Sequence, residues 1–281
     1  MKKIIYIPDG QEQTKALQRT THLCIAAHQD DTEFMAFSPI AECFQKQDKW
    51  FCGVVTCDGA GSPRNGLYAD FTDEDMKAIR ITEQKKAAAI GEYGAQILLS
   101  YSSAEVKDKT NERVVNDYIE ILKATKPKYV YIHNLADKHE THVATALKAI
   151  KALRLLPTDE QPEKVYGCEV WRDLDWMNDS EKVLLDCSSH PNLARALSSV
   201  FDSQIIGGKR YDLAVEGRRA ANATFGKNVC DTYTGLNYAM DLTPLIKDKN
   251  LDIAEYVCGY IDRFKDNVKN LLGKLQWMKL K

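Results

Sequence analysis

The stretch HLCIAAHQDDTEF, residues 22–34, decides the expected fold and the expected site of this chain. Its unbroken apolar run is typical of a strand that is buried on both faces of a sheet. One imidazole and two carboxylates, at His28, Asp30 and Asp31, follow this run directly. Adjacent carboxylates repel each other, and charges beside a core are costly unless a cation holds them. The stretch therefore predicts a buried strand with a metal site at its carboxyl end.

Strand-like and helix-like segments alternate through the first two thirds of the chain. Apolar runs predict strands, and helical spacing of apolar residues predicts helices. The strands are expected at 22–27, 50–57, 95–101, 128–133, 164–171 and 182–188, and the helices at 33–47, 73–91, 111–125 and 141–156. This alternation predicts an α/β, Rossmann-like fold, with a mostly parallel sheet flanked by helices and right-handed crossovers.

After residue 188 the pattern turns helical. We expect a single domain over residues 1–281, with a core at about 20–226 and a helical C-terminal extension at 227–281. The extension carries an apolar stripe between Ile253 and Leu275 at helical spacing. This stripe predicts packing of the last helix on the core, with a contact in a homo-oligomer as the alternative.

Composition limits the classes of partner. The 281 residues are 44% hydrophobic and 28% charged, and 38 basic against 40 acidic residues give a net charge of -2. Such a balance argues against nucleic acid or an anionic membrane as the main partner. No apolar run approaches the roughly 20 residues of a spanning helix, and the N-terminal run is too short for a signal peptide. We therefore expect a cytoplasmic protein with no integral membrane segment.

The cysteines show no spacing of a metal or redox motif. All 8 occur singly, without a C-x-x-C pair, and most lie inside apolar runs. Cysteine in such runs behaves as a small buried hydrophobe. The pattern predicts free structural thiols.

A second polar cluster, HNLADKHETH at residues 133–142, follows the fourth expected strand. In doubly wound sheets, active groups gather beyond the carboxyl ends of the strands, where the strand order reverses. The first and fourth strands flank that reversal in a common strand order. We therefore expect the two clusters to face each other across one crevice.

A catalytic zinc site needs three protein ligands and one open position for water. His28 and Asp31, three residues apart across a strand-to-helix turn, can converge on one ion. The third ligand is expected from His133, His139 or His142, and we prefer His142 because it opens a helix. Elsewhere a lone histidine is more often a buried, hydrogen-bonded residue, which is the interpretation favoured for His133.

Two polar residues remain for chemistry once the ligands are chosen. Asp30 points elsewhere from the same turn and is free to act as a base, while His139 is placed to reach a substrate oxygen. The order His139–Glu140–Thr141–His142 is not H-E-x-x-H, so a zincin protease is excluded by spacing. The structural alternative for QDD is a helix N-cap, in which acidic side chains complement the helix dipole.

These motifs together resemble the LmbE-like, or PIG-L, family of metal-dependent N-deacetylases. The family's first motif, A-H-P-D-D-x-E, matches Ala27 to Glu33 except for Gln29, and its second, D-x-H-P-D-H, matches the outer Asp137 and both histidines of residues 137–142. VVTCDGAGS resembles the family's loop after the second strand, and RITEQKKAAAIG resembles its R-x-x-E helix. The likeness covers residues 22 to about 153, and a weaker similarity extends to about residue 226.

The resemblance implies a zinc site and a set of catalytic residues. By likeness, His28, Asp31 and His142 hold the metal, although iron, manganese or cobalt also suits such ligands. The implied catalytic residues are the general base Asp30, the oxyanion stabiliser or amine-protonating acid His139, and Arg80 in contact with the substrate or product acid. For Arg80 the structural alternative is an ion pair on the helix surface.

The implied function is the removal of an N-acetyl group from an N-acetylglucosamine-type amino sugar or glycoconjugate. The small-molecule amino sugar is then the partner, and its aglycone stays open. Two alternatives belong to other classes: a non-catalytic metal- or carbohydrate-binding protein, and a non-haem iron oxygenase, whose usual H-x-D spacing differs from the H-x-x-D here. Loop 58–72, long and rich in glycine, predicts a lid that faces the substrate.

Overall fold

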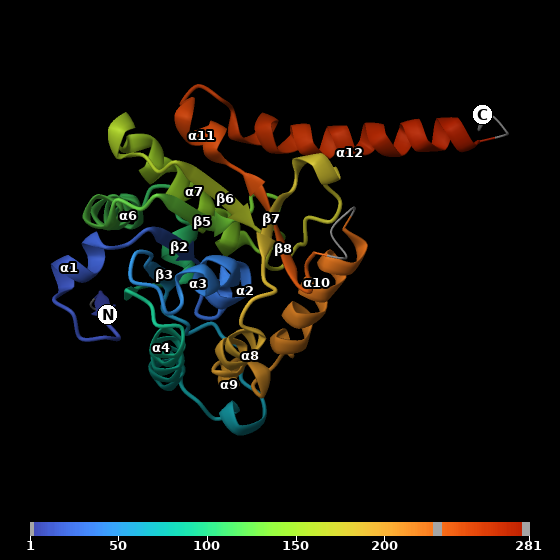
Figure 1. Ribbon diagram of the computed structural model, residues 1–281. Helices are drawn as coiled ribbons and strands as arrows, with labels where there is room; N and C mark the ends of the chain where they lie inside the picture. Colours follow the sequence, from blue (N-terminus) through green and yellow to red (C-terminus); the bar gives the residue numbers. More distant parts are fainter. Residues whose placement is uncertain (1–2, 227–231, 277–281) are drawn as a thin grey trace.

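The computed structural model describes residues 3–226 and 232–276. An eight-stranded sheet lies between two layers of helices, and a long C-terminal helix projects from one end (Figure 1). This is the predicted α/β architecture. The strands are β1 Ile4–Tyr6, β2 His22–Ala26, β3 Phe51–Cys57, β4 Ala95–Tyr101, β5 Tyr129–His133, β6 Lys164–Cys168, β7 Val183–Asp186 and β8 Leu236–Asp241. The α-helices are α1 Gln13–Gln18, α2 Asp31–Met35, α3 Phe37–Cys43, α4 Asp73–Ile90, α5 Ser103–Lys107, α6 Glu112–Thr125, α7 Glu140–Leu155, α8 Pro191–Ser199, α9 Asp202–Ile205, α10 Tyr211–Phe225, α11 Thr243–Lys247 and α12 Ile253–Leu275.

The strand order places the site. It runs β1-β4-β3-β2-β5-β6-β8-β7, and the five central strands from β4 to β6 are parallel. Strand β2 pairs with β3 on one side and with β5 on the other, so the order reverses between β2 and β5. All five residues of β2 are buried, as its continuous apolar run predicts for a strand covered on both faces. The expected adjacency of the first and fourth predicted strands is confirmed.

Each face of the sheet has its own hydrophobic core. One core is formed with α1, α5, α6, α7 and α11 and includes the buried Tyr118 of α6 and Leu153 of α7. The other is formed with α2, α3, α4 and α8 and includes Phe37 of α3 and Leu197 of α8. Helix α4 begins with a capping box between Thr72 and Asp75, which defines the residue at which the helix starts. This two-sided packing holds the strand ends of the site in place.

Three elements differ from the sequence prediction. Strand β8 falls in the segment expected to be helical, and it inserts antiparallel between β6 and β7. Its short sequence LNYAMD carries no alternating pattern, and its place is fixed by pairing and burial. Strand β1 is a three-residue antiparallel edge that has too few residues for a periodic signal. The helix expected over 33–47 is divided at Ala36 into α2 and α3.

Residues from the last third of the chain hold the turn beside the site. Arg219 of α10 donates from Nη2 to the carbonyl oxygens of Glu33, at 2.9 Å, and Phe34, at 3.1 Å. Asn237 of β8 donates from Nδ2 to the Phe34 carbonyl at 2.8 Å. These bonds satisfy carbonyl groups at the end of α2, which the short helix leaves without partners of its own. Helix α2 is therefore anchored by elements some 200 residues away in sequence.

Helix α12 only partly follows its prediction. Val257 and Tyr260 in its first turns are buried against the body of the protein, and Phe264 lies edge-on to Trp176 at 6.4 Å between ring centroids. Beyond that point the helix extends away from the body, as Figure 1 shows. The apolar stripe continues onto this part, where Leu271 is 58% exposed. Packing on the core thus accounts for the beginning of the stripe and not for its end.

The cysteines of the described segments are free thiols: six are buried and Cys258 is exposed. The eighth, Cys230, lies outside the described residues. Among the helices of residues 3–226 and 232–276, none is both long enough and apolar enough to cross a membrane.

Candidate metal centre and active site

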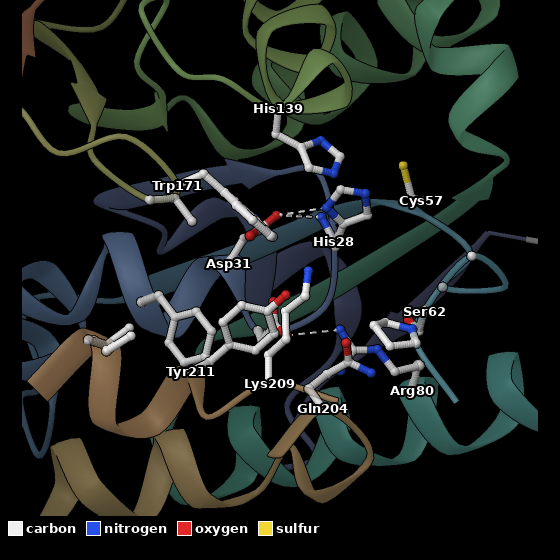
Figure 2. Close-up of a pocket in the computed structure, with 18 of the residues that line it drawn as sticks. His28, Asp31, Cys57, Ser62, Arg80, His139, Trp171, Gln204, Lys209 and Tyr211 are labelled. Carbon is white, nitrogen blue, oxygen red and sulfur yellow. Dashed lines mark hydrogen bonds and ion pairs between the residues drawn. The ribbon is translucent and has the colours of Figure 1, made fainter. Parts of the chain in front are cut away.

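The two predicted polar clusters line one cavity at the carboxyl ends of β2 and β5 (Figure 2). Its volume is about 490 Å³. His28, Asp30 and Asp31 reach it from the turn after β2, and His139 reaches it from the start of α7. The loop after β3 and the segment around α10 complete its wall. The topology therefore brings together residues more than 100 positions apart in the sequence.

Three side chains offer a ready set of metal ligands. Nδ1 of His28 lies 3.3 Å from Nε2 of His142 and 3.2 Å from Oδ2 of Asp31. The distance between Nε2 of His142 and Oδ2 of Asp31 is 3.3 Å. Ligand atoms held at 2.0–2.2 Å from one ion with tetrahedral angles would lie about 3.3–3.6 Å apart. The triangle therefore matches a shared divalent ion. His28, Asp31 and His142 are the three residues that the motifs single out.

A carboxylate behind the triangle orients one of its histidines. Nδ1 of His142, the nitrogen away from the triangle, lies 3.3 Å from Oδ2 of Asp137. Asp137 also accepts the backbone N–H groups of His139 at 3.1 Å and Trp171 at 3.2 Å. Burial acts to raise the pKa of Asp137, but the hydrogen bond from His142 and the nearby histidines hold the pKa below its ordinary value. The carboxylate fixes the ring so that Nε2 faces the metal position.

His133 lies beside the triangle and forms a second possible ligand group with Asp137 and His142. Its side chain is completely buried, and its Nε2 accepts the backbone N–H of Ala27 at 2.9 Å. That nitrogen is the one nearest the triangle, at 3.5 Å from Oδ2 of Asp31. The lone pair of His133 Nε2 is therefore already used. Through this hydrogen bond, His133 links β5 to the residue that follows β2. The sequence interpretation of His133 as a buried, hydrogen-bonded histidine agrees with this position.

Asp30 lies beside the triangle in an unusual backbone conformation. Its φ of 88° is in a region that residues other than glycine rarely adopt, and such positions cluster at functional sites. Its backbone N–H donates to Oε1 of Gln84 on α4 at 3.3 Å. Asp30 precedes the first residue of α2, but its side chain makes no capping hydrogen bond. The helix-cap alternative therefore does not account for this carboxylate.

The Asp30 carboxylate is paired with Arg80 of α4. Nη2 of Arg80 lies 3.2 Å from Oδ2 of Asp30 and also donates to the carbonyl of Gln29. Burial raises the pKa of Asp30 to about 7, against the opposing effect of the Arg80 charge. A divalent ion nearby would favour the ionised form further. The structure thus provides a buried carboxylate beside the ligand triangle, which is the placement that a general base requires.

Arg80 is buried rather than on a helix surface. Its side chain is 1% exposed, and Nη1 lies 3.4 Å from Oε2 of Glu83, the partner expected from the sequence. Glu83 accepts in turn the N–H and the hydroxyl of Ser203, both at 2.7 Å. Nε of Arg80 has no acceptor among the residues described. Arg80 thus connects the Asp30 turn to the segment that carries Ser203.

We expect Arg80→Leu to lower the free energy of unfolding by about 3–5 kcal/mol, because it leaves two buried carboxylates without their cation. Urea unfolding of the metal-free protein measures this change. Lys86→Leu, an exposed change on the same helix, is the matched control and should stay within about 0.5 kcal/mol. Adding Glu83→Leu to Arg80→Leu should cost less than the sum of the two single changes. An Arg80→Leu protein as stable as the control would contradict the inferred role of the buried network.

His139 lies above His28 in Figure 2, with 5.1 Å between the two ring centroids. Its ring stacks on His142 at 4.4 Å between centroids and meets Trp171 at 5.7 Å. Burial, with the neighbouring charges of His142 and His28, lowers the pKa of His139 to about 4. Its Nδ1 is buried and has no partner in the described part of the chain. A neutral imidazole has one N–H donor and one acceptor nitrogen, and His139 lines the cavity with this ring.

Comparison with known families agrees with the motifs. Residues 23–153 match the model of the PIG-L family, described as GlcNAc-PI de-N-acetylase. This part of the chain matches the PIG-L domain. All three residues of the ligand triangle and Asp30, Arg80 and His139 lie within it. No curated protein sequence matches the chain.

Solved structures extend the likeness beyond the PIG-L domain. The chain is similar to N,N'-diacetylchitobiose deacetylase from Pyrococcus horikoshii, with a TM-score of 0.62, 16% identity and coverage of 86% of this chain and 90% of that one. It is similar to the 4-carboxy-2-hydroxymuconate hydratase of Pseudomonas putida, with a TM-score of 0.56, 18% identity and coverage of 83% and 100%. A third is the A40926 pseudoaglycone deacetylase, with a TM-score of 0.56, 15% identity and coverage of 79% and 97%. At these identities the likeness establishes the fold.

Loop 58–72 contributes its first part to the cavity. The wall includes Asp58, Gly59, Gly61, Ser62 and Pro63. The second part of the loop contains a short 3-10 helix, Gly66–Tyr68, and the hydroxyl of Tyr68 donates to Asp202 at 2.6 Å. The predicted position facing the cavity agrees with the structure, and opening and closing of the loop stays a prediction.

Sequence reasoning missed the part of the cavity outside the PIG-L domain. This wall includes Trp171, which follows β6, and Lys209, Tyr211 and Arg218 on or just before α10. The position of Trp171 at the end of a predicted parallel strand was a signal that could have identified it. No spacing rule marks the other three, because only the folded chain brings α10 over the strand ends.

Proposed function

We propose that this protein is a metal-dependent N-deacetylase that hydrolyses the acetamide of an N-acetylglucosamine-type amino sugar or glycoconjugate. The observation that carries the proposal is the triangle of His28, Asp31 and His142 with the buried carboxylate of Asp30 beside it. The description of the PIG-L family and the two deacetylases among the similar structures support the same reaction. Zinc is the proposed ion, and iron, manganese and cobalt are alternatives for the same ligands.

A divalent ion in this site would lower the pKa of water and polarise the amide carbonyl. Asp30 takes the proton of the attacking water and later returns it towards the departing nitrogen. His139 donates a hydrogen bond from above to the oxygen on which negative charge develops. Arg80 holds the Asp30 carboxylate in position and lines the cavity, where we assign it to contact with the substrate or the product acid. Amine and acetate are the products.

The side chains, rather than the fold, select this reaction. One of the similar structures is a hydratase, and one fold commonly supports several chemistries. A non-catalytic protein that only binds metal or carbohydrate would not need a buried carboxylate held at positive φ next to the ligands. The position of Asp30 therefore favours hydrolysis over binding alone.

The direct test combines metal analysis with product detection. We expect one divalent ion per chain by elemental analysis after purification without chelator, and release of acetate from N-acetylglucosamine derivatives. The assay is repeated with protein reloaded separately with zinc, iron(II), manganese and cobalt. Bound metal without acetate from any acetylated amino sugar would reject the deacetylase and favour a binding protein. Absence of metal after reloading would reject the metal centre itself.

A further inference from the structure

The outer wall of the active-site cavity carries cationic side chains that the proposed hydrolysis does not use. Lys209, Arg210 and Arg218 line the cavity from α10 and the residue pair before it, outside the PIG-L domain. Figure 2 shows Lys209 on the side of the cavity opposite His139. The negative groups that pair with these cations must belong either to the protein or to the substrate.

The other charges of the cavity wall are already balanced. Asp58 lies 3.5 Å from Lys77, and Asp30 lies 3.2 Å from Arg80. Asp31 is surrounded by the histidines of the metal triangle. Asp30 and Asp58 therefore have cationic partners of their own, and Asp31 belongs to the ligand triangle, so none of these three carboxylates pairs with the outer wall.

Two of the outer cations have no carboxylate partner in the described residues. Arg210 is paired with Asp212 at 2.7 Å, but neither Lys209 nor Arg218 has a carboxylate oxygen within 4.0 Å in residues 3–226 and 232–276. Half-buried Arg218 donates one guanidinium nitrogen to the carbonyl of Val170. This contact fixes the group beside Trp171 and leaves other N–H groups to donate.

Aromatic rings hold Lys209 in the same place. Its Nζ lies 4.3 Å from the ring centroid of Trp171 and 5.9 Å from that of Tyr211. The two rings meet edge to face at 6.0 Å. A lysine that lies against ring faces is more restricted than one in solvent, because the rings attract its charge. Lys209 and Arg218 are thus two held cations on the wall of the cavity that His28 and Asp31 of the ligand triangle also line.

We propose that this wall is an anion subsite, and that the amino-sugar substrate carries a phosphate or carboxylate group that Lys209 and Arg218 bind while the acetamide reaches the metal triangle. This inference rests on the proposed function for the identity of the sugar. Guanidinium and ammonium groups together match either anion, since both offer several acceptor oxygens. The substrate class is accordingly an anionic N-acetylated amino sugar.

The test measures binding separately from turnover. Calorimetry on the full-length, metal-loaded protein compares glucosamine with glucosamine 6-phosphate, glucosamine 1-phosphate and muramic acid, which are already deacetylated and are not turned over. We expect at least one anionic ligand to bind about tenfold or more tighter than glucosamine, with an affinity that falls as salt is raised. Phosphate and carboxylate ligands distinguish the two sources of charge. If no anionic ligand binds tighter than glucosamine, the subsite is rejected.

Variants assign the effect to the two cations. Lys209→Met and Arg218→Gln should each remove most of the preference for the anionic ligand and leave the affinity for glucosamine within about twofold. Glutamine keeps a donor for the Val170 carbonyl, so the wall stays in place. Lys249→Met, an exposed lysine far from the cavity wall in sequence, is the matched control and should bind like the wild type. A preference that survives in both cavity variants would overturn the assignment.

Acetate release from the acetylated forms of the same sugars separates this inference from the proposed function. Faster release from anionic sugars supports both. Equal release from neutral and anionic sugars keeps the deacetylase and rejects the subsite. Tight binding of the anionic ligands without acetate from any sugar keeps the subsite and rejects the deacetylase.

Discussion

Asp31→Ala is expected to abolish both metal binding and acetate release. Asp31 supplies the one carboxylate of the ligand triangle, and its Oδ2 lies within 3.3 Å of a nitrogen of each ligand histidine. Two histidines alone lack the third ligand that a catalytic site requires. We expect metal affinity to fall by more than the 10–100-fold that loss of a supporting residue costs. Elemental analysis and acetate assays on the same preparation measure the two losses together.

Asp137→Asn provides a graded control for that result. Asp137 contacts His142 and not the metal position, so its change should weaken metal binding by about 10–100-fold and leave a protein that excess metal can reactivate. Thermal unfolding with chelator present checks that Asp31→Ala still folds cooperatively. An Asp31→Ala protein with full metal content and wild-type acetate release would show that the triangle is not the metal centre.

Asp30→Asn is expected to keep the metal and to lower kcat by about 10²–10⁴-fold. Asparagine has nearly the same shape, keeps an oxygen for the Arg80 contact and lacks the basic carboxylate. Because Asp30 makes no contact within the ligand triangle, metal content should remain close to one ion per chain. Measurement of kcat with the fastest acetylated sugar, next to elemental analysis, separates proton transfer from metal binding.

Glu140→Gln is the matched control for Asp30→Asn. Glu140 lies in the second motif, but its side chain is 82% exposed and pairs with Lys107 on the surface. Its change should leave kcat within about twofold. Loss of metal from Asp30→Asn would instead identify Asp30 as a ligand, and wild-type kcat would show that another group takes the proton.

The sequence was most informative where one physical signal is strong. The continuous apolar run of β2 and the polar residues after it predicted a buried strand with a metal site at its carboxyl end. The second polar cluster, after β5, predicted the side of the site that faces it. The rule that strand order reverses at the site then placed both clusters on one cavity. The sequence therefore identifies His28, Asp31 and His142 as candidate ligands, and their atoms lie at metal-ligand spacing in the structure.

Other features depend on contacts that local patterns do not encode. Arg80 has the spacing of a surface ion pair with Glu83, and the packing of α4 against the Asp30 turn and Ser203 makes this pair buried. Strand β8 is recognisable by its pairing with β6 and β7, since its own six residues mix polar and apolar types. In the same way, Lys209 is far along the sequence from the last motif, and it lines the cavity because the folded chain brings α10 over the strand ends.

The hydrogen bonds from Arg219 and Asn237 to the end of α2 have a consequence for modular engineering. The family match ends at residue 153, but the donors that hold the end of α2 lie beyond it. A transplant of residues 23–153 into another scaffold would carry every proposed ligand but leave the ligand-bearing turn without its donors. Designers who exchange substrate specificity between relatives would therefore need to move α10 and β8 together with the motifs, as one inseparable unit.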